Sequence, residues 1–179
     1  MPDDPGDFSS ENHSVLHVHL KGNHFNFLNR FPESFTKFGT PGKYDLEVNY
    51  ADSIAYTDYV LEQIFNYAKD KLNLQAMVYF SDHATVPDKR RSPNFEGLAS
   101  VRIPFFTYFS DEYISQHKEV SATLKKHANL YWTNDLAYEL LCSIFDIKSN
   151  RFDEANSLAS EKFKYNREDL RTNCGQSKI

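Results

Sequence analysis

The spacing of apolar residues along the first half of the chain predicts three regular elements. In residues 15–20 (VLHVHL) apolar positions alternate with His17 and His19, which favours a short β-strand with histidines on one face. Residues 49–72 repeat apolar side chains at spacings of three, four and seven, the pattern of an amphipathic helix. Residues 76–82 (AMVYFSD) form an apolar run too short for a helix, so they predict a strand buried on both faces.

The second half of the chain predicts one further strand and two helices. Residues 101–110 are β-type, and Pro104 favours an edge position or the start of the strand. Residues 112–127 have a weak helical pattern and residues 134–147 a strong one, with Thr133 as the expected N-cap. The resulting order is typical of an α/β fold with a mostly parallel sheet and helices on both faces. In such sheets, ligands bind at the carboxyl ends of the strands.

Composition supports a folded chain and excludes several classes of protein. Of 179 residues, 40% are hydrophobic and 25% charged, and 15 Phe and 11 Tyr supply a core, which does not fit a disordered chain. The net charge of -5 argues against a nucleic-acid-binding module. No apolar run approaches the about 20 residues that span a bilayer, and residues 1–14 read as a polar, disordered lead without secretory character. Cys142 and Cys174 have no metal-finger spacing.

The candidate chemistry lies where two predicted strands end. Asp82 and His83 follow one strand, and His19 and His24 lie at the end of the other. An Asp and three His are suitable ligands for zinc, with manganese as a second option, and zinc takes about four ligands. We therefore expect these four side chains to converge in one cleft. The alternative is that Asp82 and His83 form a turn that caps the next helix.

Other charged and nucleophilic residues give weaker signals. Lys89, Arg90 and Arg91 are able to bind a phosphate, although a solvated surface loop is the plainer interpretation. We expect the remaining histidines, at positions 13, 117 and 127, to be solvated, and Cys142 to be packed in the core. No Ser, Thr or Cys has the setting of a recognisable catalytic nucleophile, and no glycine-rich phosphate loop occurs.

Several stretches in order resemble one family. They are HLKGNHFNFLNRF from His19 to Phe31, YADSIAYTDYVLEQI from Tyr50 to Ile64, VYFSDH from Val78 to His83, VRIPFFTYFSDEYI, and TNDLAYELLCSIFDI. Together they resemble the C-terminal half of the sulfatase-like phosphoethanolamine transferases of the alkaline phosphatase superfamily. The resemblance implies that residues 15–172 are the C-terminal part of a sulfatase-like catalytic domain and that residues 173–179 are a tail.

The resemblance also implies an activity and roles for residues. Family members use zinc to transfer phosphoethanolamine from a phospholipid donor to lipid A or another bacterial envelope glycan, at the periplasmic face of the inner membrane, through a threonine nucleophile. Asp82 and His83 match two ligands of the catalytic metal. His24, with His19 beside it, matches the histidines that hold the substrate phosphate or a second metal.

The chain also departs from the family pattern. In the family, the nucleophilic threonine, an acidic metal ligand and the transmembrane helices belong to an N-terminal half that this sequence lacks. We therefore expect an incomplete catalytic domain, with the missing half as a partner. Ala84 and Thr85 stand where Gly-Glu usually follows the histidine. A sulfatase or phosphodiester hydrolase, and a non-catalytic anion-binding remnant, are the alternatives. Phe25, Phe27, Phe31 and Phe35 fit either an amphiphilic substrate or a core beneath a loop.

Overall fold

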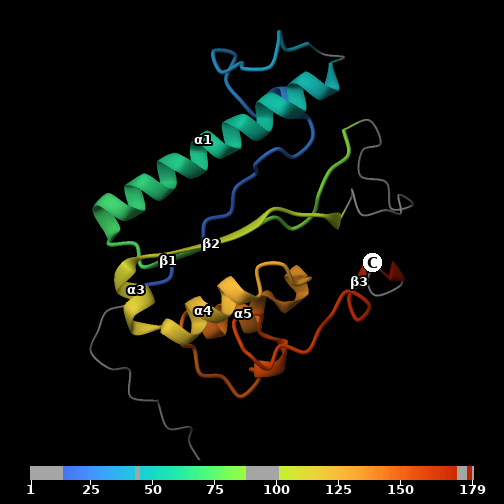
Figure 1. Ribbon diagram of the computed structural model, residues 1–179. Helices are drawn as coiled ribbons and strands as arrows, with labels where there is room; N and C mark the ends of the chain where they lie inside the picture. The colour runs from blue at the N-terminus through green and yellow to red at the C-terminus, as the bar shows by residue number, and fades with distance from the viewer. Residues whose placement is uncertain (1–13, 43–44, 88–100, 173–176, 179) are drawn as a thin grey trace, which may run out of the picture. The chain divides into compact units, whose positions relative to one another are not determined.

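The computed structural model describes residues 14–42, 45–87, 101–172 and 177–178, and it forms two compact units, Met1–Thr57 and Asp58–Ile179 (Figure 1). The helices are α1 (Leu46–Leu72), α3 (Asp111–Gln116), α4 (Lys118–Lys126) and α5 (Ala137–Ile144), with 3₁₀ turns η1 (Phe27–Asn29), η2 (Asn134–Leu136) and η3 (Glu154–Asn156). The strands are β1 (Ala76–Phe80), β2 (Phe105–Phe109), β3 (Arg171–Thr172) and β4 (Ser177–Lys178).

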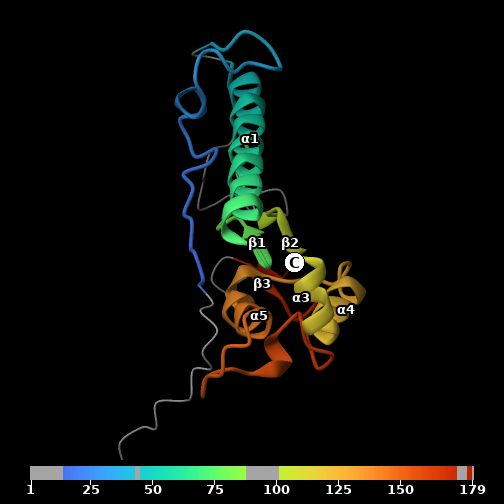
Figure 2. The same ribbon diagram turned by 90° about the vertical axis from the view of Figure 1, so that its left-hand side faces the viewer.

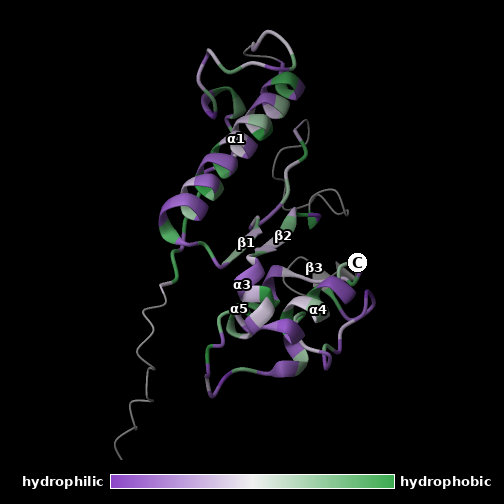
Figure 3. Ribbon diagram, turned by 60° about the vertical axis from the view of Figure 1, so that its left-hand side comes forward, coloured by the Kyte–Doolittle hydropathy of each residue, from purple (hydrophilic) through white to green (hydrophobic). Residues whose placement is uncertain are grey.

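Helix α1 confirms the helix predicted from residue 49 onward. It contains neither Gly nor Pro, and hydrophobic and hydrophilic residues interleave along it (Figure 3). The carboxylate of Asp45 caps its first turn by accepting a hydrogen bond from the Val48 amide at 3.1 Å. The helix ends at Leu72. The next residue, Asn73, has a φ of 51°, which lets the Leu74 amide donate back to the Ala68 carbonyl. In the described ranges, no helix is long and apolar enough to cross a membrane.

Polar side chains of α1 hold the loop that precedes the helix in the first unit. Asn49 and Asp52 are both fully buried. Asn49 pairs with both backbone groups of Gly42, donating to its carbonyl at 2.7 Å and accepting from its amide at 3.3 Å. Oδ1 of Asp52 accepts hydrogen bonds from the Lys37 amide at 2.7 Å and the Phe38 amide at 3.2 Å. The loop is therefore attached to the helix by buried hydrogen bonds, which are costly to lose.

The strand predicted at residues 15–20 is wrong. Residues 14–21 have no regular structure, and Leu16, on the face opposite the histidines of the predicted strand, is 74% exposed. A strand is stable when a neighbour pairs with its backbone, and among the described residues no strand pairs with this segment. The alternating pattern alone therefore does not produce a strand in this segment.

Strands β1 and β2 form the two-stranded sheet of the second unit. They pair antiparallel, with Ala76 opposite Phe109 and Phe80 opposite Phe105. On this face Ala76, Phe105 and Phe109, together with Val78, pack on the core formed with α3, α4 and α5. On the opposite face, Tyr108 lies edge-on against Phe65 of α1, with ring centroids 4.8 Å apart. β1 forms a strand, as predicted, but its five residues are half-buried and not fully buried on both faces. In Figure 2 the sheet lies next to α3 and α5 of the same unit.

The pairing direction differs from the mostly parallel sheet that we expected. Both described pairs, β1 with β2 and β3 with β4, are antiparallel. Parallel neighbours need a crossover connection, usually through a helix packed on the sheet. Apolar content alone does not report direction, because strands buried on both faces have the same composition in either arrangement. β2 begins directly after Pro104, as predicted.

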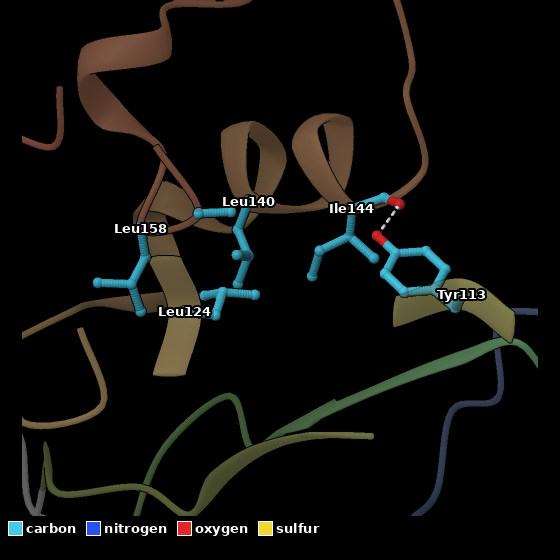
Figure 4. Packing of buried hydrophobic residues seen from close by; sticks show 6 residues of the cluster. Tyr113, Leu124, Leu140, Ile144 and Leu158 are labelled. Carbon is cyan, nitrogen blue, oxygen red and sulfur yellow. Dashed lines mark hydrogen bonds between the residues drawn. The ribbon is translucent and has the colours of Figure 1, made fainter. Parts of the chain in front are cut away.

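The main core of the second unit joins α3, α4 and α5 to a later loop. Its buried members include Tyr113, Leu124, Leu140, Ile144 and Leu158 (Figure 4). The Tyr113 hydroxyl donates a hydrogen bond of 2.6 Å to the Ile144 carbonyl at the end of α5. This bond links α3 to α5 through two residues that are 31 positions apart, and it satisfies a polar group inside an apolar cluster.

The buried carboxylate of Asp52 should contribute measurably to stability. Asp52→Ala leaves two amides without their acceptor, and each such loss costs about 1–3 kcal/mol. Asp52→Asn should lose less, because it keeps the accepting oxygen and replaces Oδ2, which has no partner. We expect this order in urea unfolding. The exposed Asp70 of the same helix is the control, and Asp70→Ala should change stability by less than about 0.5 kcal/mol. Equal stabilities of the two alanine variants would contradict the proposed role of Asp52.

Ionisation of Tyr113 should destabilise the fold at high pH. Burial, with the nearby Asp146 carboxylate, raises the pKa of Tyr113 from 10.0 to about 12. Because the folded-state pKa is the higher one, the contribution to stability is complete below about pH 10 and is lost as the pH rises towards about 12. Unfolding free energies across this interval should fall more steeply for the wild type than for Tyr113→Phe. Tyr67→Phe, at an exposed tyrosine of α1, should behave like the wild type, and parallel curves for all three proteins would refute the assignment.

Candidate metal centre

Asp82 and His83 lie in the bend that follows β1, which we call the metal-binding turn. The strand ends at Phe80, and Ser81, Asp82 and His83 follow it directly, as predicted. The Ser81 hydroxyl donates to the His83 carbonyl at 2.7 Å. Oδ1 of Asp82 accepts a hydrogen bond of 3.0 Å from the His83 amide. These two local bonds contribute to holding the backbone that carries both candidate ligands.

The His83 ring has one nitrogen available for a metal. Its Nδ1 lies 2.8 Å from the Ala84 carbonyl oxygen. A carbonyl oxygen accepts but cannot donate, so Nδ1 carries the hydrogen and the lone pair of the neutral ring is on Nε2. A backbone carbonyl in this place is the usual partner of a metal-binding histidine, because it fixes the tautomer and the ring orientation.

The distance between the two candidate donors fits a shared ion. Nε2 of His83 lies 3.7 Å from Oδ2 of Asp82. Zinc bonds to such atoms are about 2.0–2.2 Å long, so two donors less than about 4.2 Å apart can reach the same ion. The Asp82 side chain is 81% exposed and that of His83 is 24% exposed, which leaves the carboxylate accessible. The pair therefore fits as two ligands of one zinc ion.

The described residues do not supply the rest of the coordination sphere as a group. Within residues 14–42, 45–87, 101–172 and 177–178, no cluster of three or more His, Cys, Asp or Glu is placed to hold a metal ion. Zinc takes about four ligands. Asp82 and His83 are thus a partial site whose remaining ligands must come from elsewhere or from water.

His19 and His24 belong to the first unit, whereas Asp82 and His83 belong to the second. The side chains of His19 and His24 are exposed. His24 follows a turn, as a loop residue, but the strand at whose end we expected it is absent. Its amide donates to the Lys21 carbonyl and its Nδ1 lies 2.6 Å from the Phe25 carbonyl oxygen. Gly22 fits this turn because its φ is 49°, a conformation that glycine adopts at low cost. The convergence of the four side chains stays a prediction.

Other sequence-based expectations have mixed outcomes. Lys89, Arg90 and Arg91 lie outside the described residues, as do His13 and Cys174. Cys142 is buried, as predicted. The remaining two histidines, at positions 117 and 127, are not solvated in the way we expected: the first stacks on Tyr113 and the second is buried. His127 is buried because its Nδ1 pairs with the Leu158 carbonyl at 2.9 Å, which offsets the loss of hydration.

The phenylalanines near His24 divide between the two interpretations given above. Phe27 and Phe31 are buried in the first unit, and Phe27 packs against Tyr50 with ring centroids 4.9 Å apart. Phe25 is 41% exposed, and Phe38 further along the loop is 61% exposed. Part of this aromatic set is therefore core, and part is available at the surface.

Asn134 contacts the candidate site, although its sequence position gave no indication of this. Its Nδ2 donates to the Asp82 carbonyl at 2.9 Å and lies 3.4 Å from the Ser81 carbonyl. The sequence pattern assigns Asn134 to the start of a helix, and η2 indeed begins there. Thr133 occupies the N-cap position, but its side chain makes no capping hydrogen bond. A contact across more than fifty residues depends on the tertiary fold and has no local signature.

Comparison with known proteins shows the family. The Sulfatase family model matches residues 9–142 of the 179, so the chain belongs to the sulfatase family. It is 27% identical over 136 residues to the Kdo(2)-lipid A phosphoethanolamine 7''-transferase of Salmonella typhimurium, covering 67% of this chain and 24% of the relative. The Escherichia coli enzyme of that name is 26% identical over 134 residues, covering 65% of this chain and 23% of the relative. The chain thus spans about a quarter of the length of these curated relatives.

Solved structures confirm the fold. The chain is similar to the C-terminal periplasmic domain of phosphoethanolamine transferase EptC from Campylobacter jejuni, with a TM-score of 0.66, 23% identity, and 83% of this chain and 52% of that chain covered. For the corresponding domain of Escherichia coli EcEptC, the TM-score is 0.72 and the sequence identity 19%, with 84% of this chain and 46% of that chain covered. For a zinc complex of that domain, the TM-score is 0.68 and the sequence identity 20%, with 82% of this chain and 45% of that chain covered. The chain therefore has the fold of part of an alkaline-phosphatase-like domain, as predicted.

Zinc titration tests both the ligand pair and the predicted convergence. We expect the 179-residue chain to bind zinc weakly, because water completes a partial coordination shell. Asp82→Ala and His83→Ala should each weaken binding at least about tenfold, and His24→Ala should weaken it too if His24 converges with the Asp82–His83 pair as predicted. His17→Ala, at an exposed neighbouring histidine, is the control and should bind like the wild type.

Two results of that calorimetry would contradict the account. Nanomolar, stoichiometric zinc binding would mean that the chain holds a complete site. Unchanged affinity in His24→Ala, together with loss of binding in His83→Ala, would restrict the site to the second unit and refute the convergence.

Proposed function

We propose that this chain supplies part of the metal-binding active site of a phosphoethanolamine transferase that acts on lipid A or another bacterial envelope glycan. The observation that carries the proposal is the Asp82–His83 pair at the end of β1, within the region that matches the sulfatase family. The curated relatives are phosphoethanolamine transferases, which favours transfer over hydrolysis to water. We place the site at the periplasmic face of the inner membrane by analogy with the similar periplasmic domains.

The residues of this chain would divide the work of binding. Asp82 and Nε2 of His83 would hold a zinc ion, with manganese as the alternative metal. His24 and His19 would bind oxygens of the substrate phosphate. A bound zinc supplies positive charge that lowers the pKa of a nucleophile and stabilises charge at phosphorus. The side chains of this chain hold and orient the reacting groups.

Ser81 is an unsuitable nucleophile despite its position beside the metal pair. Its hydroxyl hydrogen is donated to the His83 carbonyl, and the residue is half-buried at the strand end. Turning the hydroxyl towards a substrate would break the bond that shapes the turn. We therefore propose that the nucleophile comes from another part of the complete domain and that Ser81 shapes the metal-binding turn.

The exposed aromatic residues of the first unit suit an amphiphilic substrate. Phe25 and Phe38 present apolar surface on the segment that carries His24. A phospholipid donor combines an anionic phosphate with an apolar tail. Exposed aromatic side chains can contact the tail while histidines bind the phosphate. The chemistry of this segment and the identity of the relatives both support a phospholipid as the donor.

Transfer can be tested by inserting the chain into an active relative. We would replace the matching quarter of the Salmonella transferase by the 179-residue chain and measure phosphoethanolamine on lipid A by mass spectrometry. The chimera should modify lipid A, and the same chimera with His83→Ala should not, at equal protein level and membrane insertion. His17→Ala in the chimera is the matched histidine control and should leave the modification intact.

The chimera also separates the alternatives. Transfer that survives His83→Ala, or a chimera that binds zinc but leaves lipid A unmodified, would contradict the proposal. Release of free phosphoethanolamine into water, without modification of lipid A, would instead favour the phosphodiester hydrolase.

A further inference from the structure

Asn134 joins the start of η2 to the end of β1. One side-chain nitrogen, Nδ2, donates to the Asp82 carbonyl at 2.9 Å and lies 3.4 Å from the Ser81 carbonyl. Both carbonyls belong to residues beyond the last ladder pair, Phe80 with Phe105, so they have left the β-sheet pairing. Backbone carbonyls that lose a ladder partner need another donor or water. An amide group with two hydrogens can serve two neighbouring acceptors.

Aromatic packing holds the segment that carries Asn134 against the sheet. Trp132, two residues earlier, packs on Phe105 with ring centroids 4.6 Å apart and on Phe80 at 5.7 Å. These two phenylalanines form the last pair of the sheet. The segment that leads into η2 is therefore seated against the end of the sheet, which places the Asn134 side chain beside the peptide that follows β1.

The contact bears directly on the geometry of the ligand pair. Asn134 holds the backbone of Ser81 and Asp82 from outside the turn, while the Ser81 hydroxyl and the Asp82 carboxylate hold His83 from within it. The orientation of the peptide between Asp82 and His83 sets the directions in which their side chains leave the backbone. Without Asn134, that peptide could rotate, and the 3.7 Å separation of Oδ2 and Nε2 would not be maintained.

We propose that Asn134 is a positioning residue for the metal-binding pair: it does not bind the ion but fixes the turn that presents Asp82 and His83 to it. The inference rests on the proposed function, because it takes these two residues as metal ligands. Residues that orient metal ligands typically change metal affinity by about 10–100-fold when they are replaced. Asn134 should act in that range.

The test uses the full 179-residue chain and two metals. Asn134→Asp has nearly the same shape but, when ionised, cannot donate to either carbonyl. We expect it to lower zinc affinity by about 10–100-fold in calorimetry. With cobalt in place of zinc, at saturation, it should also change the visible absorption bands, which report ligand geometry. Loss of stability alone would weaken binding but would leave the spectrum of the saturated site unchanged.

A matched control and a second variant keep the test decisive. Asn129→Asp makes the same change at an exposed position of the same unit, so it adds the same charge and should behave like the wild type. If circular dichroism shows that Asn134→Asp is unfolded, Asn134→Ala removes the donors without adding charge and is measured in the same way. Wild-type zinc affinity and cobalt spectrum in a folded Asn134 variant would overturn the positioning role.

Failure of the proposed function gives a different result. If the wild-type chain binds zinc in a way that Asp82→Ala and His83→Ala do not affect, the metal assignment itself is wrong, and the positioning role falls with it. If those two variants lose binding and Asn134→Asp does not, the metal assignment stands and the positioning role alone is refuted.

Discussion

The antiparallel pairing of β1 with β2 is the constraint on which the rest of the second unit depends. Its register sends Ala76 and Phe109 to the face that packs on α3, α4 and α5, and sends Tyr108 to the face that meets Phe65. The same register ends the ladder at Phe80, so the next three residues leave the sheet together. Because each residue along a strand changes face, a slip of one position would turn these contacts outward.

The parts predictable from sequence were those with a strong local signal. Helix α1 follows from its apolar period and the absence of Gly and Pro, and β1 follows from a short apolar run that ends in polar residues. The Asp82–His83 pair was found because it stands at that strand end. The prediction of a strand at residues 15–20 was wrong, because alternation specifies a side-chain pattern, whereas a strand also needs a pairing partner.

The rest depends on contacts between distant residues. The burial of His127 requires the Leu158 carbonyl, and the role of Asn134 requires the strand end that lies 52 residues earlier. Asp52 has the same character, since its value to the fold comes from two amides of a loop that has no regular pattern. In each case a polar side chain satisfies backbone groups that the local sequence leaves unpaired, and no propensity scale records that need.

The orientation of the His83 ring in the zinc-bound chain tests the central claim most directly. Nitrogen NMR of the ¹⁵N-labelled histidines distinguishes a metal-bound ring nitrogen from a protonated one. We predict that zinc shifts the Nε2 resonance of His83, while Nδ1 keeps its hydrogen and its bond to the Ala84 carbonyl. Zinc binding through Nδ1, or a response from other histidines with His83 unchanged, would contradict the view that the end of β1 presents a preformed metal-binding pair.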